Sequence, residues 1–244
     1  MPIKDLSHTE IWFIGTILFM LRYMIIAGLF FYVLYVWKKA KFSNLKIQKE
    51  FPEFSQIKRE VIYSLLTLVI YGSSIWLFLY WIENGQTKLY NEIDEYGIIY
   101  FFASIIFMVL LHDTYFYWTH RLIHHSKLFK YVHKVHHSFK SPTPWASFAF
   151  HPLEAIMSLG IIPIIIFMIP FHHLALLLFV TFLTVYSVII HLGFSVPELN
   201  QLKYSNTPEA HDYHHLKSKS NYGLYFTFWD KIMGTYHFEV HLKP

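Results

Sequence analysis

The stretch GIIYFFASIIFMVLLHDTYFYWTHRLIHH, residues 97–125, decides the fold of this chain. Its first part is apolar over roughly the 20 residues that an α-helix needs to cross the ~30 Å hydrocarbon core of a bilayer. We therefore expect a membrane-spanning helix at about 97–118 that carries histidines at its far end. Two further apolar runs, at about 12–36 and about 61–82, predict two more spans.

A fourth apolar region extends from about 155 to 192 and is interrupted by Pro163 and Pro170. Proline lacks a backbone N–H and kinks or ends a helix, so this region predicts a helical hairpin, either two short spans or a re-entrant pair. The expected fold class is all-α: a polytopic helical membrane protein with three clear spans, this hairpin and a helical cap that carries the histidines. We expect a single membrane-embedded domain over residues 1–244, with its core at about 46–236.

The composition supports a membrane protein. The chain of 244 residues is 55% apolar and 20% aromatic, with 15% charged residues and a mean hydropathy of +0.35. These values are too apolar for a soluble domain of this length. The length leaves little room for a fused electron carrier, so we expect any redox partner to be a separate protein. The absence of Cys excludes disulfides, thiolate metal sites and iron–sulfur clusters. We find no nucleic-acid-binding motif.

The basic residues predict the orientation. Lys and Arg are frequent between the first two spans, whereas the loop at 83–95 has one Lys among four acidic residues. Cytoplasmic loops carry the excess of Lys and Arg, so the first loop should be cytoplasmic. The segment after the third span would then be cytoplasmic too, with all the histidine clusters. The membrane would be a bacterial inner membrane or the endoplasmic reticulum.

Three histidine groups lie beyond the ends of the spans. They are His120, His124 and His125; His133, His136 and His137; and His211, His214 and His215. Residues three and four apart share one face of a helix, so each group presents several imidazoles in one direction. Without a metal, these rings would have to be solvated or protonated beside one another. Their number favours two metal ions, each with about four His, although imidazole suits Fe, Zn, Cu and Ni alike.

Other histidines and polar groups are assigned smaller roles. The isolated His8, His172, His173, His237 and His241 are expected to be structural. Asp113, Tyr117, His120 and His124 follow steps of four, three and four and so share one helix face. On that face Asp113 could accept a hydrogen bond from the second nitrogen of a ligand imidazole and orient it.

Three alternatives remain open at this point. A metal transporter would place His in the middle of the spans, where Arg22 is the main ionisable residue. A bis-His haem carrier would need only two or four axial His. A zinc-dependent lipid enzyme is a third alternative, although the H-E-x-x-H pattern is missing.

The motifs also carry a family resemblance. HDTYFYWTHRLIHH (residues 112–125), HKVHHS (133–138), HDYHH (211–215) and NYGLYFTFWDKIMGT (221–235) resemble the membrane-bound fatty acid hydroxylase and sterol desaturase superfamily. SPTPWASFAFHPLEA (141–155), YSVIIHLGF (186–194) and KIQKEFPEFSQIKREVIYS (46–64) resemble its sterol C-5 desaturase, or lathosterol oxidase, branch. The resemblance implies a cytoplasmic non-haem di-iron site. Such a site uses O2 to hydroxylate or desaturate a membrane lipid, which could be sterol-like, a carotenoid, a sphingoid base or an acyl chain. Electrons would come from a cytochrome b5-like or ferredoxin-like protein.

The resemblance also implies a ligand set: His120, His124, His133, His136, His137, His191, His211, His214 and His215. In the first group a longer spacing would use His125 in place of His124. Ser187 occupies the position where related acyl desaturases have a ligand or a water-binding side chain. The residues expected to surround and orient the ligands are Asp113, Tyr117, His112, His125, His151, Ser187 and Asp212. Asn221, Gly223, Trp229, Asp230 and Gly234 match the family's closing motif, which we expect to fold the C-terminal segment over the site.

Overall fold

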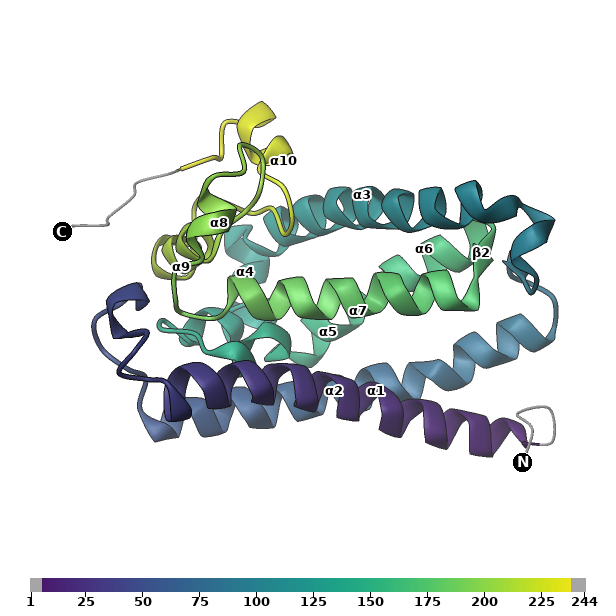
Figure 1. Cartoon of the computed structure of the whole chain (residues 1–244), viewed down its shortest axis with the longest axis horizontal. Helices are drawn as coiled ribbons and strands as arrows, with labels where there is room; N and C mark the ends of the chain where they lie inside the picture. The colour runs from purple at the N-terminus through teal and green to yellow at the C-terminus, as the bar shows by residue number, and fades with distance from the viewer. Residues whose placement is uncertain (1–5, 238–244) are drawn as a thin grey trace.

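Long helices dominate the computed structural model, which describes residues 6–237 (Figure 1). The long helices are α1 (His8–Phe31), continued by the π-helical turn η2 (Tyr32–Trp37), α2 (Phe54–Glu83), α3 (Gly97–Ile123) and α7 (His173–Ile190). The shorter ones are α4 (Ser126–Val132), α5 (Pro152–Leu159), α6 (Ile161–Met168), α8 (Pro197–Asn200), α9 (Pro208–Lys217) and α10 (Phe228–Ile232). Single 3-10 turns are η3 (Ser43–Leu45), η4 (Ile93–Glu95), η5 (His136–Ser138) and η6 (Pro144–Phe148), and two short strands are β1 (Leu89–Tyr90) and β2 (Phe171–His172). The all-α prediction is confirmed.

Four helices within residues 6–237 are long and apolar enough to cross a membrane. They are His8–Trp37, Phe54–Glu83, Gly97–Ile123 and His173–Ile190, so each of the three clear predicted spans is present. Large apolar side chains are exposed on their outer faces, with Ile25 65% and Ile99 84% exposed. In a bilayer these faces contact hydrocarbon, and the chain is a polytopic membrane protein.

The hairpin prediction needs one correction. The helix is interrupted at Gly160, between α5 and α6, and not at Pro163. Pro163 lies in the first turn of α6, where its missing N–H has no intrahelical partner to lose. Pro170 does separate α6 from α7, and α7 alone is long enough to span. The α5–α6 pair is a short apolar segment of Pro152–Met168.

The helices pack in two groups. Helices α1 and α2 are in close contact along their length. The methyl group of Thr16 on α1 packs against Gly72 on α2, where any side chain larger than hydrogen would clash with it. Phe101, Met108, Ile165 and Phe179 form a core between α3, α6 and α7. Tyr23, Leu68 and Val188 form a second core that joins α1, α2 and α7. Arg22 on α1 donates from Nη1 to Thr181 Oγ1 on α7, at 3.4 Å, and so pairs with another span.

The parallel pair β1–β2 closes the end of the bundle opposite to the cap. It joins the loop after α2 to the link between α6 and α7, and His172 lies within 3.0 Å of Asn91 O there. The other end carries the cap of α4, η5, α8, α9 and α10 (Figure 1). All three histidine groups therefore lie at one end of the bundle.

Candidate metal centre

Nine histidines converge in two adjacent clusters. Cluster A contains His120, His124, His133, His137 and His214, and cluster B contains His136, His191, His211 and His215. Within each cluster, one ring nitrogen from every member lies within 4.8 Å of the others. The nine residues are the ligand set that the resemblance implied, and the structure divides it into one group of five and one of four.

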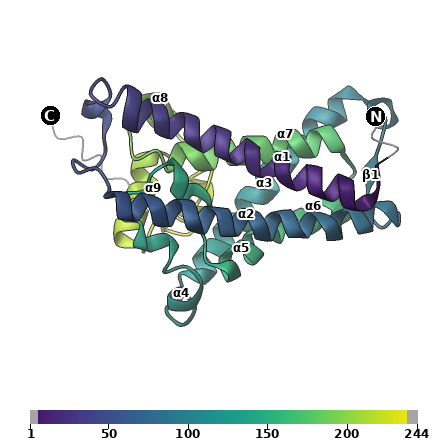
Figure 2. The same cartoon turned by 90° about the horizontal axis from the view of Figure 1, so that it is seen from below.

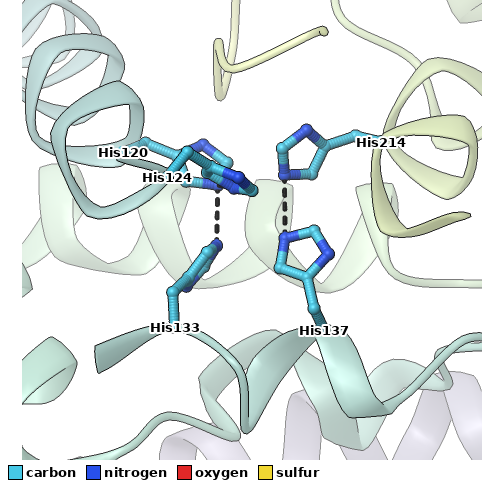
Figure 3. A group of neighbouring side chains, drawn as sticks. All are labelled: His120, His124, His133, His137 and His214. Carbon is cyan, nitrogen blue, oxygen red and sulfur yellow. Dashed lines mark hydrogen bonds between the residues drawn. The ribbon is translucent and has the colours of Figure 1, made fainter. Parts of the chain in front are cut away.

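Five separate chain segments build these clusters. The end of α3 supplies His120 and His124, the turn after α4 supplies His133, and η5 begins at His136. His191 caps the C-terminus of α7, and α9 supplies the last three histidines. In Figure 3, His120, His124 and His214 face His133 and His137 across the centre of cluster A. No single helix could present such an enclosed set, so the clusters depend on how the cap folds.

Hydrogen bonds at Nδ1 fix the orientation of several rings. His120 Nδ1 lies 2.8 Å from Tyr222 O, and His191 Nδ1 lies 2.7 Å from Ser187 O. His214 Nδ1 lies 2.6 Å from Ser220 O. A carbonyl oxygen only accepts, so these Nδ1 atoms carry the proton and donate it. Each Nε2 then presents a lone pair to the centre of its cluster.

The lone pairs face one another at short range. Nε2 of His120 lies 3.0 Å from Nε2 of His133, and Nε2 of His137 lies 3.1 Å from Nε2 of His214 (Figure 3). In cluster B, Nε2 of His211 lies 2.9 Å from Nε2 of His191. Two acceptors at this distance repel unless a cation lies between them. The donor sets therefore fit metal ions that prefer imidazole.

Protons cannot supply that positive charge at neutral pH. Burial lowers the pKa of every cluster histidine outside the α3 span, and the neighbouring imidazoles lower several of them further. The pKa falls to about 3 for His137 and to about 4 for His191, in both cases mainly through burial. These rings are neutral at pH 7 and remain available as ligands.

The structure separates His124 from His125. His124 points into cluster A, whereas His125 is exposed and accepts a hydrogen bond from Lys127 N as the N-cap of α4. His151 has a similar capping role at α5, where it accepts from Leu153 N. His125 and His151 therefore cap helices and belong to neither histidine cluster.

The other predicted neighbours contact groups outside the clusters. Asp113 accepts from Tyr225 N and Phe226 N, at 2.9 Å and 3.1 Å, and not from an imidazole. Tyr117 OH pairs with Thr235 Oγ1, and His112 Nδ1 lies 2.9 Å from Tyr225 OH. These hydrogen bonds join the C-terminal segment to α3. They lie on the same face of α3 as His120.

Asp212 and Ser187 have different surroundings. Asp212 accepts from Gln48 Nε2 at 2.8 Å and so joins α9 to the loop after α1. Burial raises the pKa of Asp212 to about 6. Ser187 orients His191 through its backbone carbonyl, while its side chain faces a cavity described below. His241 lies outside the described residues.

Glu154 contacts a cluster histidine and was missed by sequence reasoning. Its Oε1 lies 2.7 Å from His133 Nδ1, and both side chains are buried. A carboxylate at this position orients the ring and raises the basicity of Nε2. The signal in the sequence was a lone acidic residue in an apolar helix, since no Asp or Glu occurs between Asp113 and Glu154.

Replacing this carboxylate tests its role. We expect Glu154→Gln to lower metal affinity at cluster A by about 10- to 100-fold, the usual loss when a ligand imidazole loses its carboxylate partner. Competition with a chromophoric chelator measures this. Glu198→Gln removes an exposed carboxylate on α8 and serves as the control. Equal affinities for the two variants would mean that Glu154 does not tune the site.

The C-terminal segment covers cluster A. Asp230 accepts from Tyr222 N and Gly223 N, at 2.9 Å and 2.8 Å, and Asn221 Nδ2 donates to Ala210 O. A Cβ at Gly223 would clash with Phe226 O, so only glycine fits this turn. The turn places Tyr222 O 2.8 Å from His120 Nδ1. The closing motif was expected to fold the C-terminal segment over the site, and the segment does so here.

Two adjoining cavities lead to the clusters. The smaller one, of about 50 Å³, is lined by His120, His133, His136, His191 and His211. The larger one, of about 200 Å³, extends between the helices and has walls that include Phe19, Phe78, Leu176 and Val180. They share six lining residues: His112, Phe116, Phe150, Ser158, Ser187 and Leu224. An apolar ligand can therefore lie in the large cavity and reach the histidines.

The fold and the site together define a class of protein: a polytopic helical membrane protein with two buried histidine clusters at the end of an apolar cavity. The fatty acid hydroxylase family model matches residues 105–235, which is more than half of the chain. This chain belongs to the fatty acid hydroxylase family.

Curated relatives agree with this membership. A Delta(7)-sterol 5(6)-desaturase of Gibberella zeae is 35% identical over 188 residues, which cover 76% of this chain and 58% of that protein. Lathosterol oxidase of Homo sapiens is 36% identical over 191 residues, which cover 76% of this chain and 63% of that protein. The chain thus spans about three-fifths of the length of these relatives. No solved structure matches the chain.

Proposed function

We propose that this protein is an O2-dependent di-iron oxidoreductase that hydroxylates or desaturates a membrane lipid with electrons from a separate carrier protein. The observation that carries the proposal is the pair of histidine clusters at the end of an apolar cavity. The sterol desaturases among its relatives favour the same chemistry. Imidazole binds both iron and zinc, so the ligands do not choose between these metals. The similarity to sterol desaturases favours iron.

The reaction balances with two external electrons. Hydroxylation converts a C–H bond, O2, two electrons and two protons into an alcohol and one water. Desaturation removes two hydrogens from neighbouring carbons and yields a double bond and two waters from the same O2, electrons and protons. Two iron ions in clusters A and B would supply the O2 and redox chemistry that an unactivated C–H bond requires.

The residues of this chain provide ligands, position and exclusion of water. The apolar walls of the large cavity bind the hydrocarbon part of the lipid. The smaller cavity would then hold the reacting carbon beside His120, His136 and His191. The ligand rings are held in place by Tyr222 O, Ser187 O, Ser220 O and Glu154, so metal ions bound to these rings would lie at a fixed distance from the lipid.

The metal content tests the proposal. We expect the protein, expressed with added iron and purified anaerobically, to contain two irons per chain and to lack a haem absorption band. Reduced protein should consume O2 when lipid extracts are added, and mass spectrometry should find a lipid product changed by one added oxygen or by two lost hydrogens. Retention of zinc under these conditions, with no O2 uptake, would contradict the proposal.

A further inference from the structure

One side of the clusters faces the cavity, and the other side faces the corner between α3 and α4. The cavity side includes five of the nine histidines, and in the proposed function the lipid would occupy this side. Of the nine, all of them within the described residues, His124 is the one that is partly exposed, and it lies at the corner between α3 and α4. Electrons from a protein donor would therefore reach cluster A from this corner, since the cavity side is enclosed by helices.

Phe129 connects this corner to the surface of the cap. Its ring, on α4, lies 5.4 Å from the ring of His124 and 5.4 Å from that of His137. Ser218 Oγ lies 2.9 Å from His137 Nδ1, so the turn after α9 flanks the same corner. Figure 2 shows α4 projecting from the body of the helices. One layer of side chains thus separates cluster A from the outer face of α4.

That outer face is basic. Lys127, Lys130 and Lys134 are exposed on and next to α4, and Lys217 and Lys219 are exposed on either side of Ser218. We call these five lysines, with the half-buried Arg121, the α4 patch. The sequence has no acidic residue from 114 to 153, and the next one, Glu154, is buried against His133. Asp230 interacts electrostatically with Arg121, whereas none of the five lysines forms an ion pair within residues 6–237. The positive field of the α4 patch therefore comes mainly from these lysines.

We propose that the α4 patch is the docking site of a small, acidic, one-electron carrier protein, which transfers electrons to cluster A through the His124–Phe129 corner. This inference rests on the proposed function, which requires two electrons per turnover. The carrier is oxidised by one electron at each encounter and the metal centre is reduced by one. A positive patch that meets a negative one raises the association rate and weakens with salt. A lipid headgroup could also neutralise the lysines, but it would bring no electrons to the corner.

Binding to the protein as purified tests this site without requiring turnover. The probes are a soluble cytochrome b5 haem domain and a [2Fe–2S] ferredoxin, both acidic, and binding is measured by biolayer interferometry in detergent. The test variant is K127E/K130E/K134E. The control K39E/K41E/K49E makes the same change in net charge at exposed lysines after α1, at the same end of the bundle. Size-exclusion chromatography verifies that both variants are folded.

We expect the wild type to bind one of the two carriers, with an affinity that falls at high salt. The test variant should bind at least about tenfold more weakly at low salt, and the control should bind less than about twofold more weakly. Equal weakening in both variants, no weakening in the test variant, binding of neither carrier, or binding of anionic vesicles alone would each overturn the docking site. Lipid turnover driven by a chemical reductant is measured separately. Its absence in the wild type would contradict the proposed function and leave the docking result intact.

Discussion

His136→Ala and His214→Ala are each expected to reduce the metal content from two ions per chain to one and to bring lipid turnover below detection. The two residues lie in different clusters, His214 in cluster A and His136 in cluster B. Each removal takes one imidazole from a buried set whose remaining members cannot move to replace it. Because both ions are needed to handle two electrons in the proposed reaction, losing either one should stop it.

The matched control for this experiment is His125→Ala. His125 is adjacent to His124 in the sequence, but it is exposed and caps α4. We expect this variant to keep two metals and nearly full turnover. Elemental analysis and product formation are measured on the same samples. Normal turnover in His136→Ala or His214→Ala, or loss of metal in His125→Ala, would contradict the assignment of the clusters.

Val180→Trp is expected to reduce lipid turnover by about 100-fold while leaving the metal content unchanged. Val180 lies on α7 in the wall of the large cavity, away from the histidines. An indole there would occupy the space of the hydrocarbon part of the lipid. A substrate displaced by about 1 Å from its reactive position can lose about 10²-fold in rate.

Leu177→Trp is the control for the cavity. Leu177 lies one turn earlier on the same helix and is 54% exposed, so an indole there would face lipid and not the cavity. We expect normal turnover in this variant. Product formation and O2 uptake are measured on the same samples. In Val180→Trp we expect product formation to fall while O2 uptake continues, because the change blocks the lipid and leaves the metal ligands in place. Full activity in Val180→Trp would mean that the lipid binds elsewhere.

The sequence alone predicted the long elements and the identity of the candidate ligands. Apolar runs of the length of a bilayer define α1, α2 and α3, because the hydrocarbon core requires every backbone polar group to be bonded within its own helix. The nine histidines were identified from their spacing and from the family resemblance, and the structure gathers the same nine. Whether they bind metal stays a prediction.

Tertiary structure decided the rest. Spacing could not choose between His124 and His125, since both fit a helical face, and only the end of α3 after Ile123 directs one inward and leaves the other as a cap. Spacing also suggested that Asp113 orients an imidazole, whereas Glu154 does so from another helix. The division into clusters of five and four, the cavity that reaches them and the basic face of α4 all depend on contacts between segments far apart in the chain. Local sequence fixes which groups share a helix face, but which faces meet is determined by the packing of the whole chain.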